Sequence, residues 1–339
     1  MSAQMDPADE FPHRHPGTPN WTESFMFQAY SPGTRIGCFF HVGRASWGDP
    51  DLWLERLTVT LPDGRAAVSG AYRKGHREHG GGTDACYADC LEPYAAWTVV
   101  FDAAVQLTNL REMLDGRLRM GVQQPLHMEL RWRPIGPIWD QRDMKIHSLK
   151  SVHYEQAGWL SGFVGVDGVR LPFEGPGRRD RSWGIRNFAA LEEHTILHGE
   201  FPDDGIAFAT AWFRVSDGPA TPPRGYVAFG PSIEDITAAT LPTTALFSPA
   251  GSPFEAVLPT HRGDLRIQGR VLQSFVHTLL NPNGVAVGAD LEDDRAVILC
   301  GFQVELEADG RNGFGFMERS GKAPSVRAAA ARARTASDK

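Results

Sequence analysis

The chain has 339 residues, enough for two buried cores of roughly 150 residues each. Its formal net charge of -7 gives no electrostatic reason for a polyanionic partner, because binding of phosphate backbones needs clustered Lys and Arg, so we expect no nucleic acid partner. Nine Trp, 19 Phe, 36 Gly and 24 Pro residues are typical of many short strands joined by tight turns. The composition therefore favours a mainly β fold.

The first 20 residues are rich in Pro, His and acidic side chains and show no periodicity, which predicts a flexible arm that adds little to stability. The first thirty residues hold neither a basic segment followed by an apolar run nor a stretch long enough to cross a bilayer. We expect no membrane span and a cytoplasmic protein. Four scattered cysteines are expected to be free thiols: Cys38, Cys86, Cys90 and Cys300.

A β-hairpin pattern recurs between the two ends of the chain. Apolar and polar residues alternate, an Asp-Gly pair turns the chain, and the alternation resumes. The unit appears four times, with turns at Asp63-Gly64, Asp167-Gly168, Asp204-Gly205 and Asp309-Gly310. The best helical candidate, Asn109 to Arg117, is short and ambiguous.

Successive hairpins with little helix predict sheets that close, or nearly close, into barrels and so hide their edges. A barrel of about eight strands can enclose one small ligand. We expect an N-terminal lobe at 21–185, a C-terminal lobe at 186–322 and a polar tail at 323–339. The tail is Ala/Arg-rich and is either a short frayed helix or disordered.

The segment Gly177 to Arg186 reads GRRDRSWGIR and differs from the generic hairpins. Preceded by His153-Tyr154-Glu155-Gln156, it resembles the AttH-like and carotenoid 1,2-hydratase (hydroxyneurosporene synthase) families. Proteins of those families have two lipocalin-like lobes and an Asp-His-(Ser/Asn)-Trp-Gly motif near the junction. The resemblance is clearest over residues 151–213 and implies two lipocalin-like antiparallel β-barrel lobes packed together.

The resemblance also implies a function. The characterised carotenoid enzymes add water across an isoprenoid double bond without a cofactor, and related proteins guide cyclisations. The motif aspartate corresponds to Asp180, and a family histidine upstream corresponds to His153. Arg181 stands where the family commonly has His, which departs from the family pattern.

Strand alternation places Asp180 and Ser182 on one face, and His153 and Glu155 on one face of their own strand. The three ionisable groups meet if the two strands are neighbours. Hydration of an alkene needs a strong acid, for which a carboxyl group kept protonated in an apolar pocket is suited. We predict Asp180 as the acid and His153 or Glu155 as the base. An ion pair between Asp180 and a nearby arginine is the structural alternative.

Other residues are predicted to contact the substrate, with aromatic faces available to stabilise a carbocation. These candidates are Trp183, Tyr154, Arg186, His198 and Trp212. Trp183 can equally be a core residue, and His198 a buried histidine with satisfied hydrogen bonds.

We expect neither a metal nor a cofactor. His76, His79, Cys86 and Cys90 have zinc-ligand types but the irregular spacing of a solvated loop, and no nucleotide or G-x-S-x-G hydrolase motif occurs. The predicted function is a cofactor-independent hydro-lyase or isomerase/cyclase acting on an apolar, isoprenoid-like small molecule. The alternative is a non-catalytic lipocalin-like carrier of a hydrophobic ligand.

Overall fold

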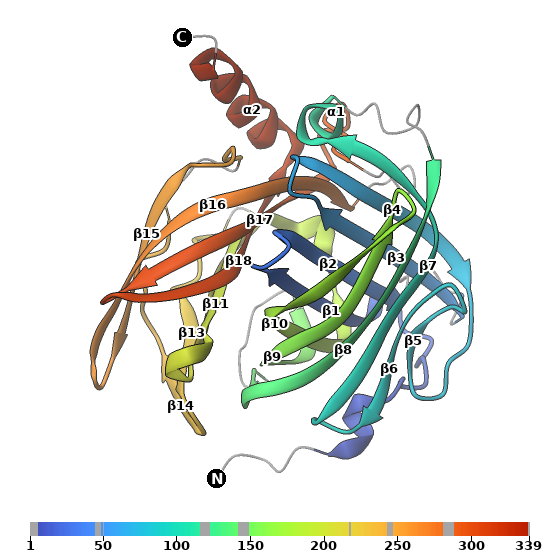
Figure 1. The fold of residues 1–339 in the computed structure, drawn as a ribbon, viewed down its shortest axis with the longest axis horizontal. Coiled ribbons are helices and arrows are strands. Elements are labelled where there is room, and N and C mark those ends of the chain that lie inside the picture. The colour runs from blue at the N-terminus through green and yellow to red at the C-terminus, as the bar shows by residue number, and fades with distance from the viewer. Residues whose placement is uncertain are drawn as a thin grey trace.

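The computed structural model describes residues 6–44, 49, 51–115, 123–141, 149–216, 218–242, 247–280 and 288–337. It contains two large antiparallel sheets, which we call the N-lobe and the C-lobe (Figure 1). The prediction of a mainly β protein with two lipocalin-like lobes is confirmed. None of the helices in the described ranges is long and apolar enough to cross a membrane.

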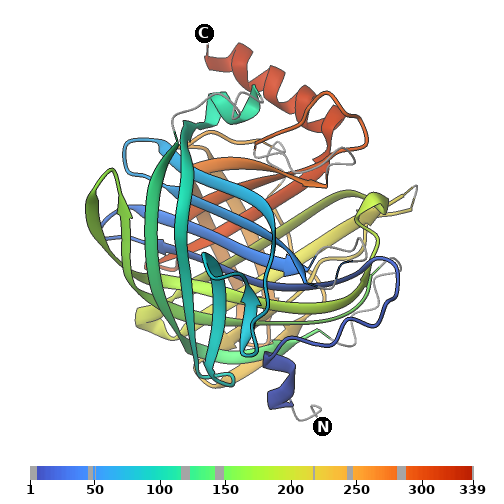
Figure 2. The same cartoon turned by 90° about the vertical axis from the view of Figure 1, so that its right-hand side faces the viewer.

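The N-lobe is a ten-stranded sheet in the order β4-β3-β2-β1-β10-β9-β8-β7-β6-β5. β4 also pairs with β7, which closes the eight strands that run from β4 to β7 in this order into a barrel (Figure 2). Strands β6 and β5 continue the sheet beyond β7. The strands are β1 (Trp21–Ser31), β2 (Ile36–Arg44), β3 (Leu52–Thr60), β4 (Arg65–Lys74), β5 (Gly80–Gly82), β6 (Cys86–Glu92), β7 (Ala96–Asn109), β8 (Gln123–Asp140), β9 (Leu149–Val166) and β10 (Val169–Arg186).

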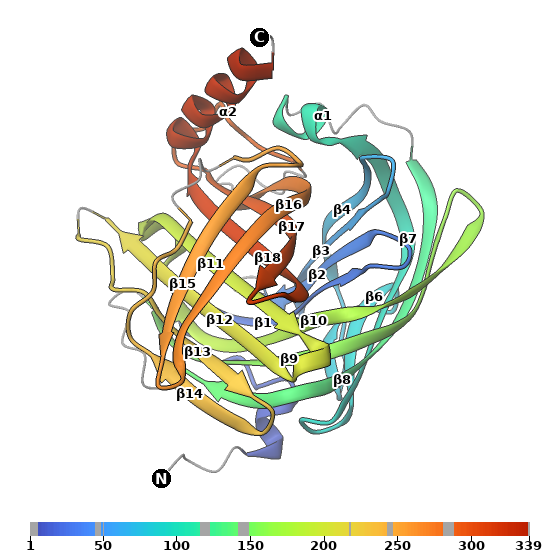
Figure 3. The same ribbon diagram turned by 60° about the vertical axis from the view of Figure 1, so that its left-hand side comes forward.

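The C-lobe is an eight-stranded open sheet in the order β14-β13-β12-β11-β18-β17-β16-β15 (Figure 3). Its strands are β11 (Leu191–Phe201), β12 (Ile206–Val215), β13 (Arg224–Phe229), β14 (Ser232–Ile236), β15 (Pro253–Thr260), β16 (Gly263–Leu280), β17 (Val297–Ala308) and β18 (Arg311–Lys322). The C-lobe is thus half of a barrel and not the closed barrel expected from the sequence. The N-lobe covers the apolar face that this open sheet would otherwise expose.

All four predicted Asp-Gly turns join paired strands. At Asp167-Gly168 and Asp309-Gly310 both turn residues have positive φ, which matches the right-handed twist of the flanking strands. The ambiguous helical segment contains α1 (Leu110–Leu114), which Asn109 caps by accepting a hydrogen bond from the Glu112 amide.

Two apolar cores explain how the lobes fit together. Side chains inside the N-lobe barrel form one core, including Trp53, Trp97 and Trp132. The second core joins the inner face of the C-lobe to the outer face of the N-lobe, where Phe39 and Val68 belong to it. The N-lobe barrel is therefore packed with side chains, and its outer wall faces the concave side of the C-lobe.

The N-terminal segment contradicts the expectation of a loose arm in its described part. Its 3-10 helix η1 (Pro7–Glu10) buries Glu10 completely. The Glu10 carboxylate accepts hydrogen bonds from Arg179 Nη1 (2.8 Å), Trp97 Nε1 (3.0 Å) and the Tyr154 hydroxyl. Sequence periodicity misses this segment because a single buried carboxylate, and not an apolar face, anchors it.

The C-terminal tail forms the helix α2 (Ala323–Ser337). Val326, Ala329 and Ala330 are buried in the core that the two lobes share. Of the two interpretations of the tail, the structure has the helix, and its inner face is packed. The four cysteines are free and buried, as expected for thiols.

Candidate active site

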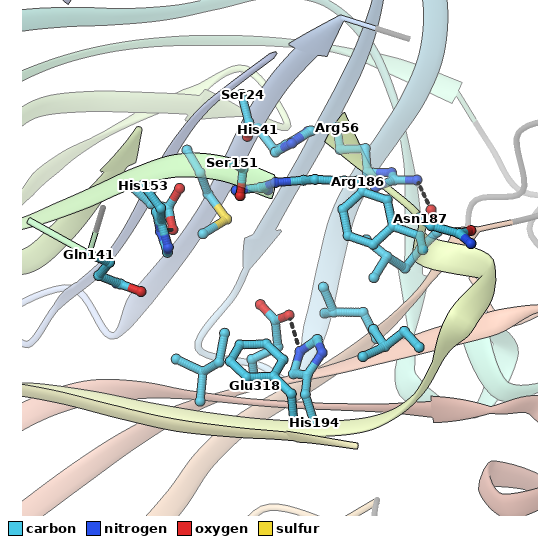
Figure 4. A pocket seen from close by; sticks show the side chains of 18 of the residues that line it. Ser24, His41, Arg56, Gln141, Ser151, His153, Arg186, Asn187, His194 and Glu318 are labelled. Atoms are coloured by element: carbon cyan, nitrogen blue, oxygen red, sulfur yellow. Dashed lines mark hydrogen bonds and ion pairs between the residues drawn. The ribbon is translucent and has the colours of Figure 1, made fainter. Parts of the chain in front are cut away.

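A cavity of about 150 Å³ lies between the outer wall of the N-lobe and the inner face of the C-lobe (Figure 4). Strands β1, β2, β3, β9 and β10 form one wall, and β11, β12, β16, β17 and β18 form the other. Most of the lining is apolar, from Met26, Phe39, Phe188, Leu191, Ile196, Phe213, Val215, Leu279 and Leu299. The polar lining residues include His41, Arg56, His153, Asp180, Arg186, His194 and Glu318.

Asp180 and His153 meet on the N-lobe wall. β9 and β10 are antiparallel neighbours in which Asp180 lies opposite Glu155, and Ser182 opposite His153. His153 Nε2 lies 2.5 Å from Asp180 Oδ2 and 3.5 Å from Glu155 Oε1. The predicted meeting of the three ionisable residues is confirmed, because alternation along two paired strands puts them on one face.

Arg178 neutralises Glu155 behind this pair. Its Nη1 donates to Glu155 Oε2 at 2.5 Å, with the arginine side chain only 1% exposed. Gln141 Nε2 donates to Glu155 Oε1 at 3.0 Å. Glu155 is therefore the ion-pair partner of Arg178, and Asp180 is the hydrogen-bond partner of His153.

The surroundings of Asp180 favour its ionised form. Burial by itself would raise the pKa of its carboxyl group, but the neighbouring His153, Arg178 and Arg186 outweigh burial and hold the pKa below its usual range. The environment thus does not favour the protonated carboxyl group expected from the sequence. Asp180 instead orients His153 through the 2.5 Å contact with Nε2, which makes His153 the candidate proton donor.

The same three residues offer ligand atoms within 4.8 Å of one another, a spacing that a metal ion can use. Their charges are already compensated, since Glu155 accepts from Arg178 and Asp180 from His153. A divalent ion would have to displace the buried arginine from Glu155. The arrangement suits proton transfer better than metal binding.

A second histidine–carboxylate pair lies on the C-lobe wall. His194 Nε2 is 2.7 Å from Glu318 Oε1, and both side chains are nearly buried. Figure 4 shows this pair across the cavity from His153. His194 Nδ1 is buried and has no hydrogen-bond partner among the described residues. This nitrogen is therefore free to take a partner, and it belongs to a residue that lines the cavity.

The two pairs occupy corresponding places in the last strand of each lobe. Asp180-Arg181-Ser182 in β10 matches Glu318-Arg319-Ser320 in β18. In each case the histidine lies opposite the serine, on a strand adjacent to the one that bears the acid. The central arginines also correspond: Arg181 contacts Glu23 at 2.6 Å, and Arg319 contacts Glu193 at 3.1 Å.

The family comparison agrees with this two-lobed arrangement. The model of a domain of unknown function (DUF7064) matches residues 6–323, nearly the whole chain. The chain belongs to this family. No curated protein is similar enough in sequence to count as a match.

Solved structures share the fold at low sequence identity. A putative AttH from Nitrosomonas europaea has a TM-score of 0.60 at 14% identity, covering 91% of this chain and 97% of that one. CghA with Sch210972 has a TM-score of 0.57 at 15% identity, covering 90% and 89%. Kievitone hydratase from Nectria haematococca has 0.54 at 7%, covering 93% and 92%. The fold expected from the resemblance of GRRDRSWGIR to AttH-like proteins is confirmed.

The predicted substrate-contacting residues lie in different parts of the structure, and only some of them line the cavity. Arg186 lines the cavity. Tyr154 points into the N-lobe and donates to Glu10, and Trp183 stacks on His13 with ring centroids 4.2 Å apart. Both belong to the wall that anchors the N-terminal segment.

Trp212 packs partly buried against the shared core and is not among the residues that line the cavity. His198 is fully buried away from the cavity, with Nε2 at 3.0 Å from Gln28 Oε1 and Nδ1 at 3.3 Å from Glu200 Oε1. It is the buried, satisfied histidine that the sequence analysis held as its alternative.

Sequence reasoning missed His41, Arg56 and Glu318 and gave His194 no role. The first two lie in strands that read as ordinary core, IGCFFHVGR and LWLERLTVT, and their outward positions depend on a second lobe covering that face. Glu318 had a usable signal, because Glu-Arg-Ser repeats the Asp-Arg-Ser of the recognised motif.

Proposed function

We propose that the cavity between the lobes is the active site of a cofactor-independent enzyme. Its substrate is an apolar, isoprenoid-like molecule, and its reaction is an acid-assisted hydration, dehydration, isomerisation or cyclisation. The observation that carries the proposal is the pair of histidine–carboxylate couples facing one apolar cavity from opposite walls. Perturbed ionisable groups in an apolar cavity are the usual mark of a catalytic site.

In the hydration direction, protonated His153 gives its proton to one carbon of a double bond. The new C–H bond uses the π electron pair and leaves a positive charge on the neighbouring carbon. Asp180 offsets the charge on His153 before transfer, and the faces of Phe39, Phe188 and Phe213 line the space where the cation forms. The surroundings thereby favour the charged intermediate.

Water then adds to the cation, and its excess proton passes to Nδ1 of His194, which Glu318 orients through Nε2. The reverse sequence eliminates water. Proton loss without addition of water moves the double bond. Attack by a second double bond closes a ring and moves the charge to another carbon, which then loses a proton to His194. All four reactions use the same two histidines, which exchange the roles of donor and acceptor in the dehydration.

The name of kievitone hydratase, one of the structural neighbours, agrees with hydration chemistry on this fold. A cytoplasmic location stays part of the proposal. A non-catalytic carrier of a hydrophobic ligand is the second candidate, which the predominantly apolar lining favours.

Turnover by variants of the two histidines tests the proposal. Apolar extracts of the source cells are incubated with the protein in deuterium oxide, and mass spectrometry follows any compound whose mass changes. His153→Gln and His194→Gln should each slow the change about a hundredfold. The exposed His76→Gln is the control and should leave it unaltered.

Recovery of an apolar compound that binds but never changes mass would support the carrier. Full turnover by both histidine variants would refute the catalytic assignment.

A further inference from the structure

A row of polar side chains crosses the N-lobe wall of the cavity. Asp180 lies opposite Met26, Met26 opposite His41, and His41 opposite Arg56, in the four adjacent strands β10, β1, β2 and β3. With about 4.8 Å between strands, Arg56 is roughly 14 Å from Asp180 along the sheet. One end of the row thus holds Asp180, the partner of the candidate proton donor His153, and the other holds a cation.

Arg56 is 8% exposed, and its Nη2 donates to the carbonyl oxygens of Thr278 (3.1 Å) and Leu279 (2.9 Å). Within the described ranges no carboxylate forms an ion pair with it. Glu318 acts on Arg56 only through space and is itself held by His194 at 2.7 Å. Arg56 is therefore a buried cation whose partners are neutral.

Arg186 and His41 lie beside Arg56 in Figure 4. Arg186 Nε is buried without a hydrogen-bond partner. Asp180 acts on the Arg186 guanidinium only through space and is itself held by His153 at 2.5 Å. His41 Nδ1 is also buried and unpartnered. Burial and the neighbouring Arg56 lower the pKa of His41 to about 3, so this imidazole is neutral and adds no charge.

Arg56 is buried and Arg186 is partly buried, and neither has a carboxylate in direct contact among the described residues. Such arginines are costly unless something compensates their charge. Elsewhere in this protein buried arginines have such partners: Arg178 pairs with Glu155 and Arg179 with Glu10. Arg56 and Arg186 are exceptions that line the cavity. The missing partner is therefore expected from the ligand.

We propose that the ligand of this cavity is an apolar molecule bearing one carboxylate, which Arg56 and Arg186 bind with His41 as an additional hydrogen-bond partner. The proposal rests on the proposed function in that the cavity is taken as the substrate site. It adds the substrate class and its orientation: the carboxylate lies at the arginine end, and the reacting carbon lies nearer His153.

Calorimetric binding of octanoate, octanol and octylamine to the full-length protein at neutral pH tests the proposal. The three probes share one chain and differ only in charge. Octanoate should bind about tenfold more tightly than octanol, because charge-assisted hydrogen bonds are roughly twice as strong as neutral ones. Octylamine should bind most weakly.

Arg56→Gln and Arg186→Gln should each remove most of the preference for octanoate over octanol. Arg186→Gln guards against misfolding, since Arg186 has no carbonyl contacts like those of Arg56. The control is Arg266→Gln, at a side chain that is 70% exposed, and it should keep the preference.

Equal affinities for octanoate and octanol, no octanoate binding, or an unchanged preference in both arginine variants would each overturn the proposal. Equal affinities would leave the role of His153 and His194 untouched. Conversely, a carboxylate preference in a protein without turnover would preserve this inference while refuting catalysis.

Discussion

Several buried arginines outside the cavity are each paired with a glutamate, and this pairing determines how stability responds to pH. Glu23 is the clearest case: burial would raise the pKa of its carboxyl group, but Arg181, His13 and Arg44 lower it to about 2. The ion pair with Arg181 therefore contributes stability above pH 4.5, the ordinary value. That contribution is lost as the pH falls toward 2.

We predict that Glu23→Gln lowers the free energy of unfolding at pH 7 by about 3 to 5 kcal/mol, because it leaves Arg181 buried without its carboxylate. Urea denaturation measures the change, with the exposed Glu255→Gln as control. The loss should shrink in acid. An equal loss at pH 7 and at the acid limit would contradict the assignment.

Glu200 behaves in the opposite way. Burial and nearby Glu155 raise the pKa of its carboxyl group to about 8, although Arg178 partly lowers it. The uncharged acid is favoured in the fold, so stability is complete below pH 4.5 and declines as the pH rises to 8.

Replacing Glu200 by Gln should remove that decline. We expect Glu200→Gln to stabilise the protein by about 1 to 3 kcal/mol at pH 8 and to change little at pH 4.5. Thermal unfolding at the two pH values is the measurement. Destabilisation by the same amount at both would mean that the carboxyl group has a structural role independent of its charge.

At the scale of elements, short polar segments contribute more to the stability of the fold than their sequences suggest. η1 supplies Glu10 to the barrel interior, where Arg179 also contacts the faces of Trp97 and Trp132 at 5.7 and 4.9 Å. Glu10→Gln should destabilise the protein by about 3 kcal/mol, since Arg179 loses its buried carboxylate. The exposed Glu92→Gln should be neutral in the same denaturant titration.

The helix α2 permits a matched test at adjacent positions. Ala329 is buried in the shared core, and Ala328 is exposed. Ala329→Asp should lower the free energy of unfolding by about 3 kcal/mol or more, because an unpaired charge is forced into an apolar core. Ala328→Asp should stay within about 0.5 kcal/mol. Similar effects at the two positions would show that the helix does not pack.

The hairpins were predictable because Asp-Gly turns and two-residue alternation are local signals, and all four joined the expected strands. The anchoring of η1 was not predictable, since it depends on the contact of the Glu10 carboxylate with Arg179, which is 169 positions away in the sequence. Alternation also showed which face Asp180 shares with Ser182. It could not assign that face to a cavity, because the opposing wall comes from another lobe.

At the scale of the molecule, the site exists only because two lobes face each other. The N-lobe barrel closes on a packed interior, and its outer wall supplies His153 and Asp180. The C-lobe stays open and supplies His194 and Glu318 on its concave face.

The repeated Asp/Glu-Arg-Ser sequence gives each lobe one histidine–carboxylate pair and one buried arginine–glutamate pair. The two arginines hold the strands, and the two histidines face the cavity. The sequence could have suggested this correspondence through residues 180–182 and 318–320. The joining of both pairs in one cavity required the packing of the lobes.

A crystal structure with the apolar ligand retained from the source cells tests the central claim most directly. The account predicts ligand density between the lobes, in contact with His153 on one wall and His194 on the other. Ligand density inside the N-lobe barrel, among Trp53, Trp97 and Trp132, would contradict it.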